Sequence, residues 1–298
     1  MTVNRSHISV CVCTFKRPQL LERLLVALGD QQNGGLFTLG VVVVDNDEAR
    51  SAEPTVIACR ALTSVRIDYY TESYKGIPQA RNKAVLHSEG DLVAFIDDDE
   101  IPAADWLLRL YETARRYEAD AVLGPVTPHY STDPPDWLIK CRFLERPRCP
   151  TGTELPWFNT RTGNVLLSRA VFDGGRTLFR PEFRHSEDQD FFQRIIARGR
   201  RVVWCDEAVV NEIQGAERFT VEYFLKRALL RGNVSLRLQQ HKLPMVFKAA
   251  IAFTVYVAAL PALAVIRRDL AILYLTKSCD HLGKLMAACG IDVQRRLT

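Results

Sequence analysis

The sequence contains no Cys-x-x-Cys pair and no histidine cluster, although it has eight cysteines and six histidines among 298 residues. Zinc sites and disulfide frameworks are usually built from such patterns, so we expect neither here. The cysteines at 11 and 13 lie in an apolar strand pattern and should pack as small hydrophobic side chains. No secretory signal precedes residue 8, and we expect a reducing, cytoplasmic setting.

A glycine-rich phosphate loop is also missing, which argues against the Rossmann dinucleotide and Walker motifs. The net charge of +4 is too small to indicate a nucleic-acid partner. Basic residues do cluster late in the chain, between residues 226 and 268. That cluster fits an anionic nucleotide, an anionic membrane surface or a solvated helix face.

The first half of the chain alternates apolar strand patterns with amphipathic helix patterns. We expect strands at residues 8–12, 41–44, 65–70 and 92–96, and helices at 18–28, 78–88 and 106–117. This order predicts an α/β fold with a mostly parallel sheet and helices on both faces. Six prolines interrupt residues 127–156, where we expect a long functional loop. Further along, we expect strands at 164–167 and 202–204 and a helix from 187.

The most informative segment reads FIDDDE at residues 95–100. The apolar run before it predicts a buried strand, and ligands bind at the carboxyl ends of such strands in open α/β sheets. Packed carboxylates repel one another unless a cation lies among them. Mg²⁺ commonly shares carboxylate ligands with substrate phosphates, so the segment predicts a metal–diphosphate site. The alternative is a solvated surface charge run, although such runs do not normally end an apolar strand.

Other polar segments follow predicted strands or open predicted helices. Residues 14–18 offer free N–H groups to an anion or a base, unless Thr14 only caps the helix. Residues 45–47 either accept hydrogen bonds from a ribose hydroxyl or a base N–H, or only form a turn. Arg81 lies near clustered acids, as a nucleotide contact or in a structural ion pair. The acids at 187–190 either complement the helix dipole or supply a general base.

The tail differs in kind, because residues 249–266 are apolar apart from Thr254 and Tyr256. Pro261 interrupts this run and basic residues flank it on both sides. Its length is at the lower edge for a spanning helix, so we predict a re-entrant or interfacial membrane segment. A buried helix of a C-terminal bundle is the alternative. We therefore predict a first domain over residues 1–238 and a helical, membrane-associating region over 239–298.

Six segments together resemble, in order, the motifs of family 2 glycosyltransferases. They are TFKRP at 14–18, VDN at 44–46, GIPQARN at 76–82, FIDDD at 95–99, RTGN at 161–164 and EDQDFF at 187–192. The resemblance covers about residues 7–238 and implies the GT-A fold of nucleotide-diphospho-sugar transferases. Residues 97–100, 124–126 and 187–192 look closest to succinoglycan-type exopolysaccharide glucosyltransferases.

The resemblance also implies roles for the matched positions. Asp188 would deprotonate the acceptor hydroxyl. Asp99 would bind a divalent metal, Mg²⁺ or Mn²⁺, with Asp97 and with Glu212, where many relatives carry a histidine. Contacts to the nucleotide-sugar would come from Thr14, Phe15, Arg17, Asp45, Asn46, Arg81, Asp97, Asp98, Arg227 and Arg231. Contacts to the donor or acceptor sugar would come from Arg161, Gly163, Asn164, Glu187 and Trp157, whose ring either stacks on a sugar or packs in the core.

These features predict a metal-dependent, inverting transferase that moves a sugar, glucose by analogy, from a UDP-sugar to a lipid-linked saccharide at the cytosolic membrane face. The Gln-x-x-Arg-Trp motif of processive relatives is missing, so we expect a single transfer. Three alternatives stay open. They are a haloacid-dehalogenase-type phosphohydrolase, a sugar nucleotidyltransferase that would need a glycine-rich N-terminal loop, and a non-catalytic scaffold of a glycan-assembly complex.

Overall fold

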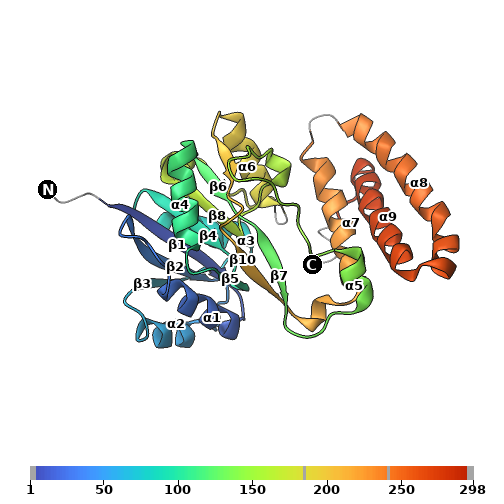
Figure 1. Cartoon of the computed structure of the whole chain (residues 1–298). Coiled ribbons are helices and arrows are strands. Elements are labelled where there is room, and N and C mark those ends of the chain that lie inside the picture. The colour runs from blue at the N-terminus through green and yellow to red at the C-terminus, as the bar shows by residue number, and fades with distance from the viewer. Residues whose placement is uncertain (1–4, 184–185, 240–241, 294–298) are drawn as a thin grey trace. The chain divides into compact units, whose positions relative to one another are not determined.

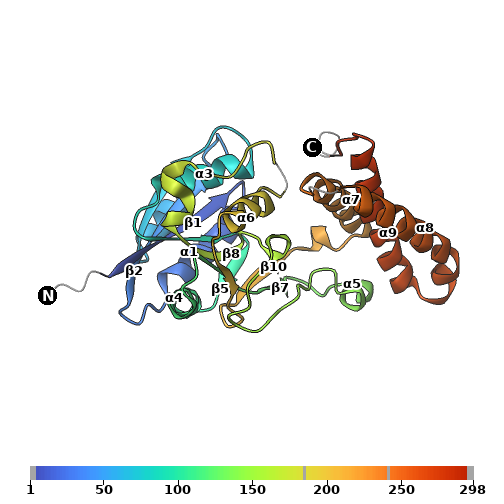
Figure 2. The same ribbon diagram turned by 90° about the horizontal axis from the view of Figure 1, so that it is seen from above.

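A computed structural model describes residues 5–183, 186–239 and 242–293, which form two compact units (Figures 1 and 2). The first unit comprises residues 1–129 and 146–213, and the second comprises 130–145 and 214–298. These bounds differ from the domain boundary that we expected at residue 238. That boundary stays a prediction. Each unit is described by itself.

A seven-stranded sheet forms the centre of the first unit. Its strands run in the order β3 (Arg66–Thr71), β2 (Phe37–Asp45), β1 (Ser6–Thr14), β4 (Leu92–Ile96), β8 (Asn164–Ser168), β6 (Ala121–Leu123) and β9 (Val202–Trp204). Neighbouring strands are parallel except for β8, which runs antiparallel to both β4 and β6. The predicted mostly parallel sheet is confirmed.

Helices cover both faces of this sheet, as alternation along the strands requires. On one face, Val10 and Val43 belong to a core with α1 (Pro18–Gly29), α2 (Glu53–Arg60) and α4 (Trp106–Tyr117). On the other, Cys11 and Val44 belong to a core with α3 (Ile77–His87), α6 (Glu187–Ala197) and the short helix η2 (Arg169–Gly175). The α/β architecture predicted from the sequence is therefore present.

A second, three-stranded sheet was not predicted. It contains β5 (Glu100–Pro102), β10 (Val210–Gln214) and β7 (Val126–Tyr130), in that order. The segment expected to be one long loop, residues 127–156, thus contains most of β7 and the helix α5 (Asp136–Cys141), and the short helix η1 (Trp157–Asn159) follows it directly. Three residues are too few to show alternation, and β5 and β6 were missed, although the equally short β9 was predicted.

The second unit is helical. It contains α5, η3 (Ala216–Arg218), α7 (Val221–Arg237), α8 (Lys242–Ile266) and α9 (Arg268–Ala288). Helix α9 packs against both α7 and α8. In the described part of the chain, α8 is the one helix long and apolar enough to cross a membrane by length and composition. Ala249 is its one buried residue, so the alternative of a buried bundle helix is wrong.

Candidate active site

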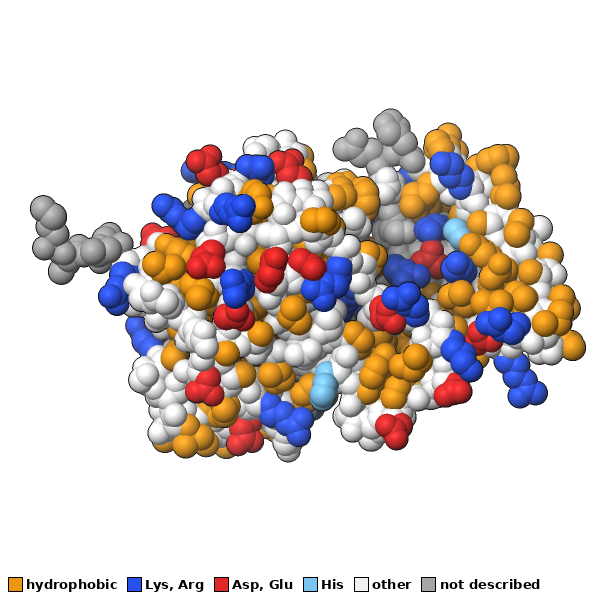
Figure 3. Space-filling view, in the orientation of Figure 1, with side chains coloured by type: hydrophobic (Ala, Val, Ile, Leu, Met, Phe, Trp, Pro, Cys, Tyr) orange, Lys and Arg blue, Asp and Glu red, His pale blue; other side chains and the backbone are white. Residues whose placement is uncertain are grey.

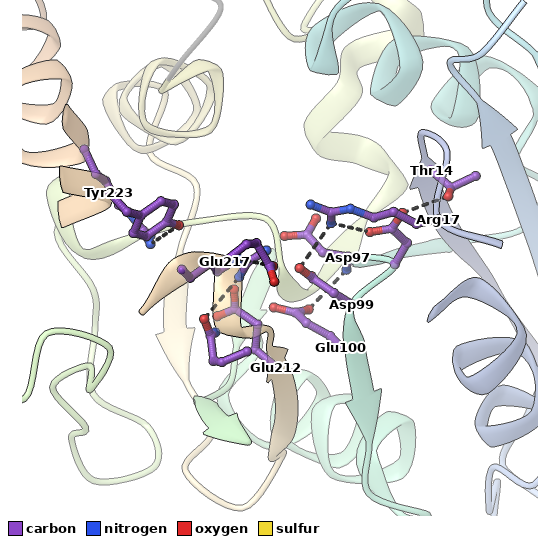
Figure 4. Close-up of polar contacts among 12 residues, drawn as sticks. Thr14, Arg17, Asp97, Asp99, Glu100, Glu212, Glu217 and Tyr223 are labelled. Atoms are coloured by element: carbon purple, nitrogen blue, oxygen red, sulfur yellow. Dashed lines mark hydrogen bonds and ion pairs between the residues drawn. The ribbon is translucent and has the colours of Figure 1, made fainter. Parts of the chain in front are cut away.

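The ends of three strands bring the predicted polar segments to one edge of the sheet. Strands β1 and β2 are paired in parallel register up to Thr14 and Asp45, and β4 lies on the other side of β1. The acid segment, residues 97–100, leaves the end of β4 at this edge. Figure 4 shows the carboxylates of Asp97, Asp99 and Glu100 gathered near Arg17.

The residues after β1 hold the acid segment in place. The Thr14 hydroxyl donates to Asp98 Oδ2 at 2.7 Å, and Arg17 Nη1 lies 3.1 Å from Asp98 Oδ1 and 3.2 Å from Asp99 Oδ2. Burial raises the pKa of Asp98 to about 6, against the opposing effects of Thr14 and Arg17. Thr14 and Asp98 thus support this turn, and the nucleotide contacts expected of both stay predictions. Phe15, between Thr14 and Arg17, exposes 44% of its surface.

Asp97 is the open member of the acid segment. Its side chain is 49% exposed, whereas those of Asp98 and Asp99 are 7% and 6% exposed. The Asp97 amide donates to Glu100 Oε2 at 3.1 Å, and burial raises the pKa of Glu100 well above its ordinary value. A solvent-accessible carboxylate at the end of a buried strand can accept a ligand without unfolding the turn.

Glu212 reaches this region from β10. It lies opposite Glu100 in the antiparallel pairing of β10 with β5, and Arg146 Nη2 lies 3.0 Å from its Oε2. The placement of Glu100 and Arg146 beside Glu212 was not predicted. Glu100 stood in the acid run, which was a usable signal. Arg146 stands in the proline-rich segment, where nothing local indicates its distant partner.

Backbone approaches the acids closely at Gly163. A Cβ atom there would lie 2.6 Å from Glu100 Oε1 and 3.1 Å from Asp97 Oδ2, so a larger residue would force these carboxylates to move. Its neighbour Asn164 is buried and fully bonded: the amide nitrogen donates to the carbonyls of Pro125 and Ala208, and its oxygen accepts from Trp106 Nε1 at 2.7 Å. The Asn164 amide thus anchors the start of β8, and its expected sugar contact, which would have to replace these bonds, stays a prediction.

The oxygen donors present fit a divalent cation shared with a substrate. Among the residues that the structure describes, no three acid, histidine or cysteine side chains form a cage that could hold a metal ion by themselves. Mg²⁺ characteristically takes one or two carboxylates together with substrate phosphates. Asp97 and Asp99 would supply such carboxylates. Glu212 as a third ligand stays a prediction.

Arg81 connects the acid segment to α6. Its buried guanidinium bonds to Glu187 Oε1 and lies 3.4 Å from Asp97 Oδ1. Burial raises the pKa of Glu187, and the Arg81 charge opposes that shift. Of the two roles considered for Arg81, the structural ion pair is therefore present in the structure. A sugar contact by Glu187 would have to compete with this ion pair.

Asp188 follows Glu187 in the first turn of α6. It is half-buried, and its Oδ1 accepts from the Gln189 amide at 2.7 Å. The Gln189 side chain in turn donates to the Phe158 carbonyl at 3.4 Å, which ties η1 to α6. Trp157 on η1 packs against the core, so its ring is at least partly structural. Arg161, just beyond η1, is half-buried.

The residues after β2 serve the fold. Asp45 is fully buried and accepts from Asp47 N, Ala52 N and the Tyr69 hydroxyl at 3.0, 2.8 and 3.0 Å. A nucleotide contact by Asp45 would need this turn to open.

Asn46 bonds to backbone groups of Glu72, Tyr74 and Gly76 and so fixes the loop before α3. Its amide is occupied by these bonds. The nucleotide contacts expected of Asp45 and Asn46 stay predictions.

Arg227 and Arg231 belong to α7 in the second unit. Arg227 Nη1 donates to the Tyr223 hydroxyl at 3.2 Å, and Arg231 Nε lies 2.8 Å from Asp280 Oδ1 on α9. Arg231 therefore joins two helices of its own unit. The diphosphate contacts expected of both arginines stay predictions.

Comparisons with known proteins agree with this geometry. Residues 9–183 match the model of Glycosyl transferase family 2. The chain is 35% identical over 240 residues to the succinoglycan biosynthesis protein ExoM of Rhizobium meliloti (strain 1021), covering 79% of this chain and 76% of that protein. It is 26% identical over 221 residues to ExoW of the same organism, covering 68% and 67%.

Two solved structures share the fold. The structure of S. aureus TarS 1–349 in complex with UDP-GlcNAc aligns over 96% of this chain and 93% of its own, with a TM-score of 0.57 and 18% identity. The mannosyltransferase PcManGT from Pyrobaculum calidifontis, in complex with GDP-Man and Mn²⁺, aligns over 96% and 87%, with a TM-score of 0.63 and 18% identity. The GT-A fold expected from the sequence is confirmed, and the chain belongs to glycosyltransferase family 2.

Proposed function

We propose that this enzyme moves a sugar, glucose by the resemblance, from a UDP-sugar to a saccharide acceptor in exopolysaccharide biosynthesis, with inversion at the anomeric carbon. The observation that carries the proposal is the acid segment after β4, which Thr14 and Arg17 hold while Asp97 stays open. ExoM, named for succinoglycan biosynthesis, supports the pathway, and the UDP-GlcNAc complex of TarS supports the donor class.

The acid segment would bind the diphosphate end of the donor. Asp97 and Asp99 would hold a divalent cation, Mg²⁺ or Mn²⁺, with Glu212 as a further candidate ligand. When bound, such a cation neutralises charge that develops on a departing diphosphate. Arg17, whose side chain is 44% exposed beside these acids, would add positive charge where the diphosphate lies.

Asp188 would act as the general base. It stands in the first turn of α6, and a carboxylate can accept a proton as a general base. In the proposed step Asp188 takes the proton of the acceptor hydroxyl as that oxygen bonds to the anomeric carbon. The bond from that carbon to the diphosphate oxygen breaks on the opposite face, and UDP leaves with the electron pair. One such displacement inverts the configuration.

The acceptor in this proposal is a lipid-linked saccharide at the cytosolic face of the cell membrane, with the enzyme peripherally attached. The support for attachment is α8, whose outer surface is apolar and exposed. The missing Gln-x-x-Arg-Trp motif supports a single transfer. Phosphohydrolase chemistry is disfavoured, because β1, β2 and β3 precede the acid segment, whereas haloacid-dehalogenase-type enzymes carry it after their first strand.

The test is turnover of radiolabelled UDP-sugars by the purified full chain, with and without EDTA. We expect turnover with Mg²⁺ or Mn²⁺ and its loss in EDTA. Asp188→Asn should lower turnover at least about a hundredfold while UDP binding by calorimetry persists. Asp68→Asn, which changes an ion pair with the exposed Arg66, is the matched control and should keep full turnover. If the chain shows no turnover and no metal-dependent UDP binding, the non-catalytic scaffold is favoured instead.

A further inference from the structure

Helix α8 is apolar on the side that it shows to solvent. A helix on the surface of a soluble protein normally turns a polar face outward. Here Leu243 and Val265, near the two ends of α8, are 84% and 87% exposed. Between them, exposed apolar side chains continue along the helix: Phe247, Ile251, Val255 and Val257. Hydrophobic side chains gather over α8 in the space-filling view, with Lys and Arg side chains nearby (Figure 3). Such a patch indicates an interaction surface.

The charges around α8 favour anionic lipid as its partner. The second unit has 15 Lys and Arg against 8 Asp and Glu, a net charge of +7, whereas the first has 24 against 27, a net charge of −3. Lys242 and Lys248 lie in the first two turns of α8, and Arg267 and Arg268 follow its last residue. Basic residues around an apolar helix face complement anionic headgroups.

A second copy of the chain fits this surface less well. Both ends of α8 are basic, so two copies paired along their α8 helices, in either direction, would place like charges together. The +7 charge of each second unit would add to that repulsion. An anionic bilayer has the opposite sign at both ends of the helix.

The packing of α8 decides how it would meet the bilayer. Its inner side lies against α9, where the Tyr256 ring packs on Tyr274 at 5.0 Å and stacks on His281 at 5.6 Å. Helix α9 is fixed in turn to α7, through the Arg231–Asp280 ion pair at 2.8 Å. A spanning α8 would have to leave α9 or draw its charged residues, such as Lys277, into the hydrocarbon core, which is costly.

We propose that α8 lies in the plane of one leaflet of an anionic membrane, with its outer apolar side among the acyl chains and its basic ends at the headgroups. The proposal specifies the partner and the mode of the membrane attachment in the proposed function, and so rests on it. Interfacial helices of this kind bury their apolar face about 5–10 Å into the headgroup–acyl boundary. The helix would hold the enzyme on the face where a lipid-linked acceptor is available.

The first experiment is flotation of the purified full chain with vesicles. We expect flotation with vesicles that contain phosphatidylglycerol, much less with pure phosphatidylcholine, and a decline as salt is added. Ile251→Glu/Val255→Glu should abolish flotation, because it places two charges on the outer side of α8. Leu62→Glu, at an exposed apolar residue of the first unit, should float like the wild type. Equal flotation of all three proteins would overturn the proposal.

A quantitative variant tests the electrostatic part. Lys248→Gln should lower the partition coefficient on anionic vesicles about fivefold, the effect of losing about 1 kcal/mol per basic residue near the surface, and leave neutral vesicles unaffected. UDP-sugar hydrolysis without acceptor is measured on every variant. Unchanged hydrolysis with lost flotation confirms α8 as the attachment element and shows that the variants are folded. Flotation without any hydrolysis, even by the wild type, would leave attachment in place and count against the transferase proposal alone.

The second experiment distinguishes lying from spanning in cells. The full chain is fused at its C-terminus either to green fluorescent protein or to alkaline phosphatase, which is active only outside the cytoplasm. If α8 lies in one leaflet, the chain after it stays on the cytosolic side, and we expect fluorescence without phosphatase activity. Phosphatase activity without fluorescence would show that α8 crosses the bilayer and would overturn the in-plane arrangement.

Discussion

The buried guanidinium of Arg81 joins Glu187, in the first turn of α6, to Asp97, the open acid after β4. Arg81 is 7% exposed and Glu187 is 4% exposed. One side chain of α3 thus links the segment proposed to bind the diphosphate with the helix that carries the proposed base. A movement of Asp97 or of Glu187 would therefore alter the contact that Arg81 makes with the other acid.

Removal of Arg81 should destabilise the first unit strongly. Arg81→Ala leaves the buried Glu187 without its partner, and breaking a buried pair in this way costs about 3–5 kcal/mol. The free energy of unfolding in urea measures the loss. Arg66→Ala breaks an exposed pair with Asp68 and should cost less than about 1 kcal/mol. Similar small losses for both variants would show that the buried pair contributes little.

The Thr14 hydroxyl should be needed to hold the acid segment. Thr14→Val keeps the shape of the side chain and removes the 2.7 Å hydrogen bond to Asp98. A hydrogen bond to a charged group contributes about 1.5–3 kcal/mol, so we expect a loss of stability of that size and weaker UDP binding by calorimetry. Thr14→Ser restores the hydroxyl and should recover both. Failure of Thr14→Ser to recover either would assign the loss to packing.

Gly232 should be required for the close contact of α7 with α9. A Cβ atom there would lie 1.8 Å from the Asp280 carbonyl oxygen. Gly→Ala inside an exposed helix usually stabilises by about 1 kcal/mol, but Gly232→Ala should destabilise by about 1–3 kcal/mol because the helices must separate. Thermal unfolding of the full chain measures the effect. The control is Lys226→Ala, on the exposed side of α7. A gain in stability for Gly232→Ala would contradict the prediction.

Acid should weaken the second unit through Asp280. Burial alone would raise the pKa of Asp280, but the charges and hydrogen bonds of Arg231 and Lys284 together lower it below 3.8. An acid with a lowered folded-state pKa adds stability above its unfolded pKa, and this is lost as the pH falls through the folded value. Urea midpoints from neutral into acid should fall more steeply for the wild type than for Asp280→Asn. Equal slopes would remove Asp280 as the cause.

Much of the sheet could be predicted because its residues repeat with a clear period. Leucines spaced along one side of α1 and the β-branched run of β2 show their structure within a short window. The acid segment could be placed at the end of β4 for the same reason. The small sheet was missed, since β5 has three residues and its partner β10 lies about a hundred residues further along the chain.

The site was predicted as a set of residues, and the structure shows protein partners for several of them. Thr14, Asn46 and Asn164 were expected to contact ligands, yet each forms hydrogen bonds with other groups of the protein. A short polar side chain at a strand end looks alike in sequence whether it faces a ligand or a neighbouring loop. Its partner decides, and that partner is distant in the chain: the Thr14–Asp98 bond joins residues 84 positions apart.

By itself, the sequence determined the α/β class, the acid segment at a strand end and an apolar run in the tail, because each depends on neighbouring residues. Only the tertiary structure decided that Asp97 is open while Asp98 is buried, that Arg81 pairs with Glu187, and that α8 covers one side with α9 and leaves the other bare. Exposure and pairing depend on which distant segments meet, and no local pattern of residues records that.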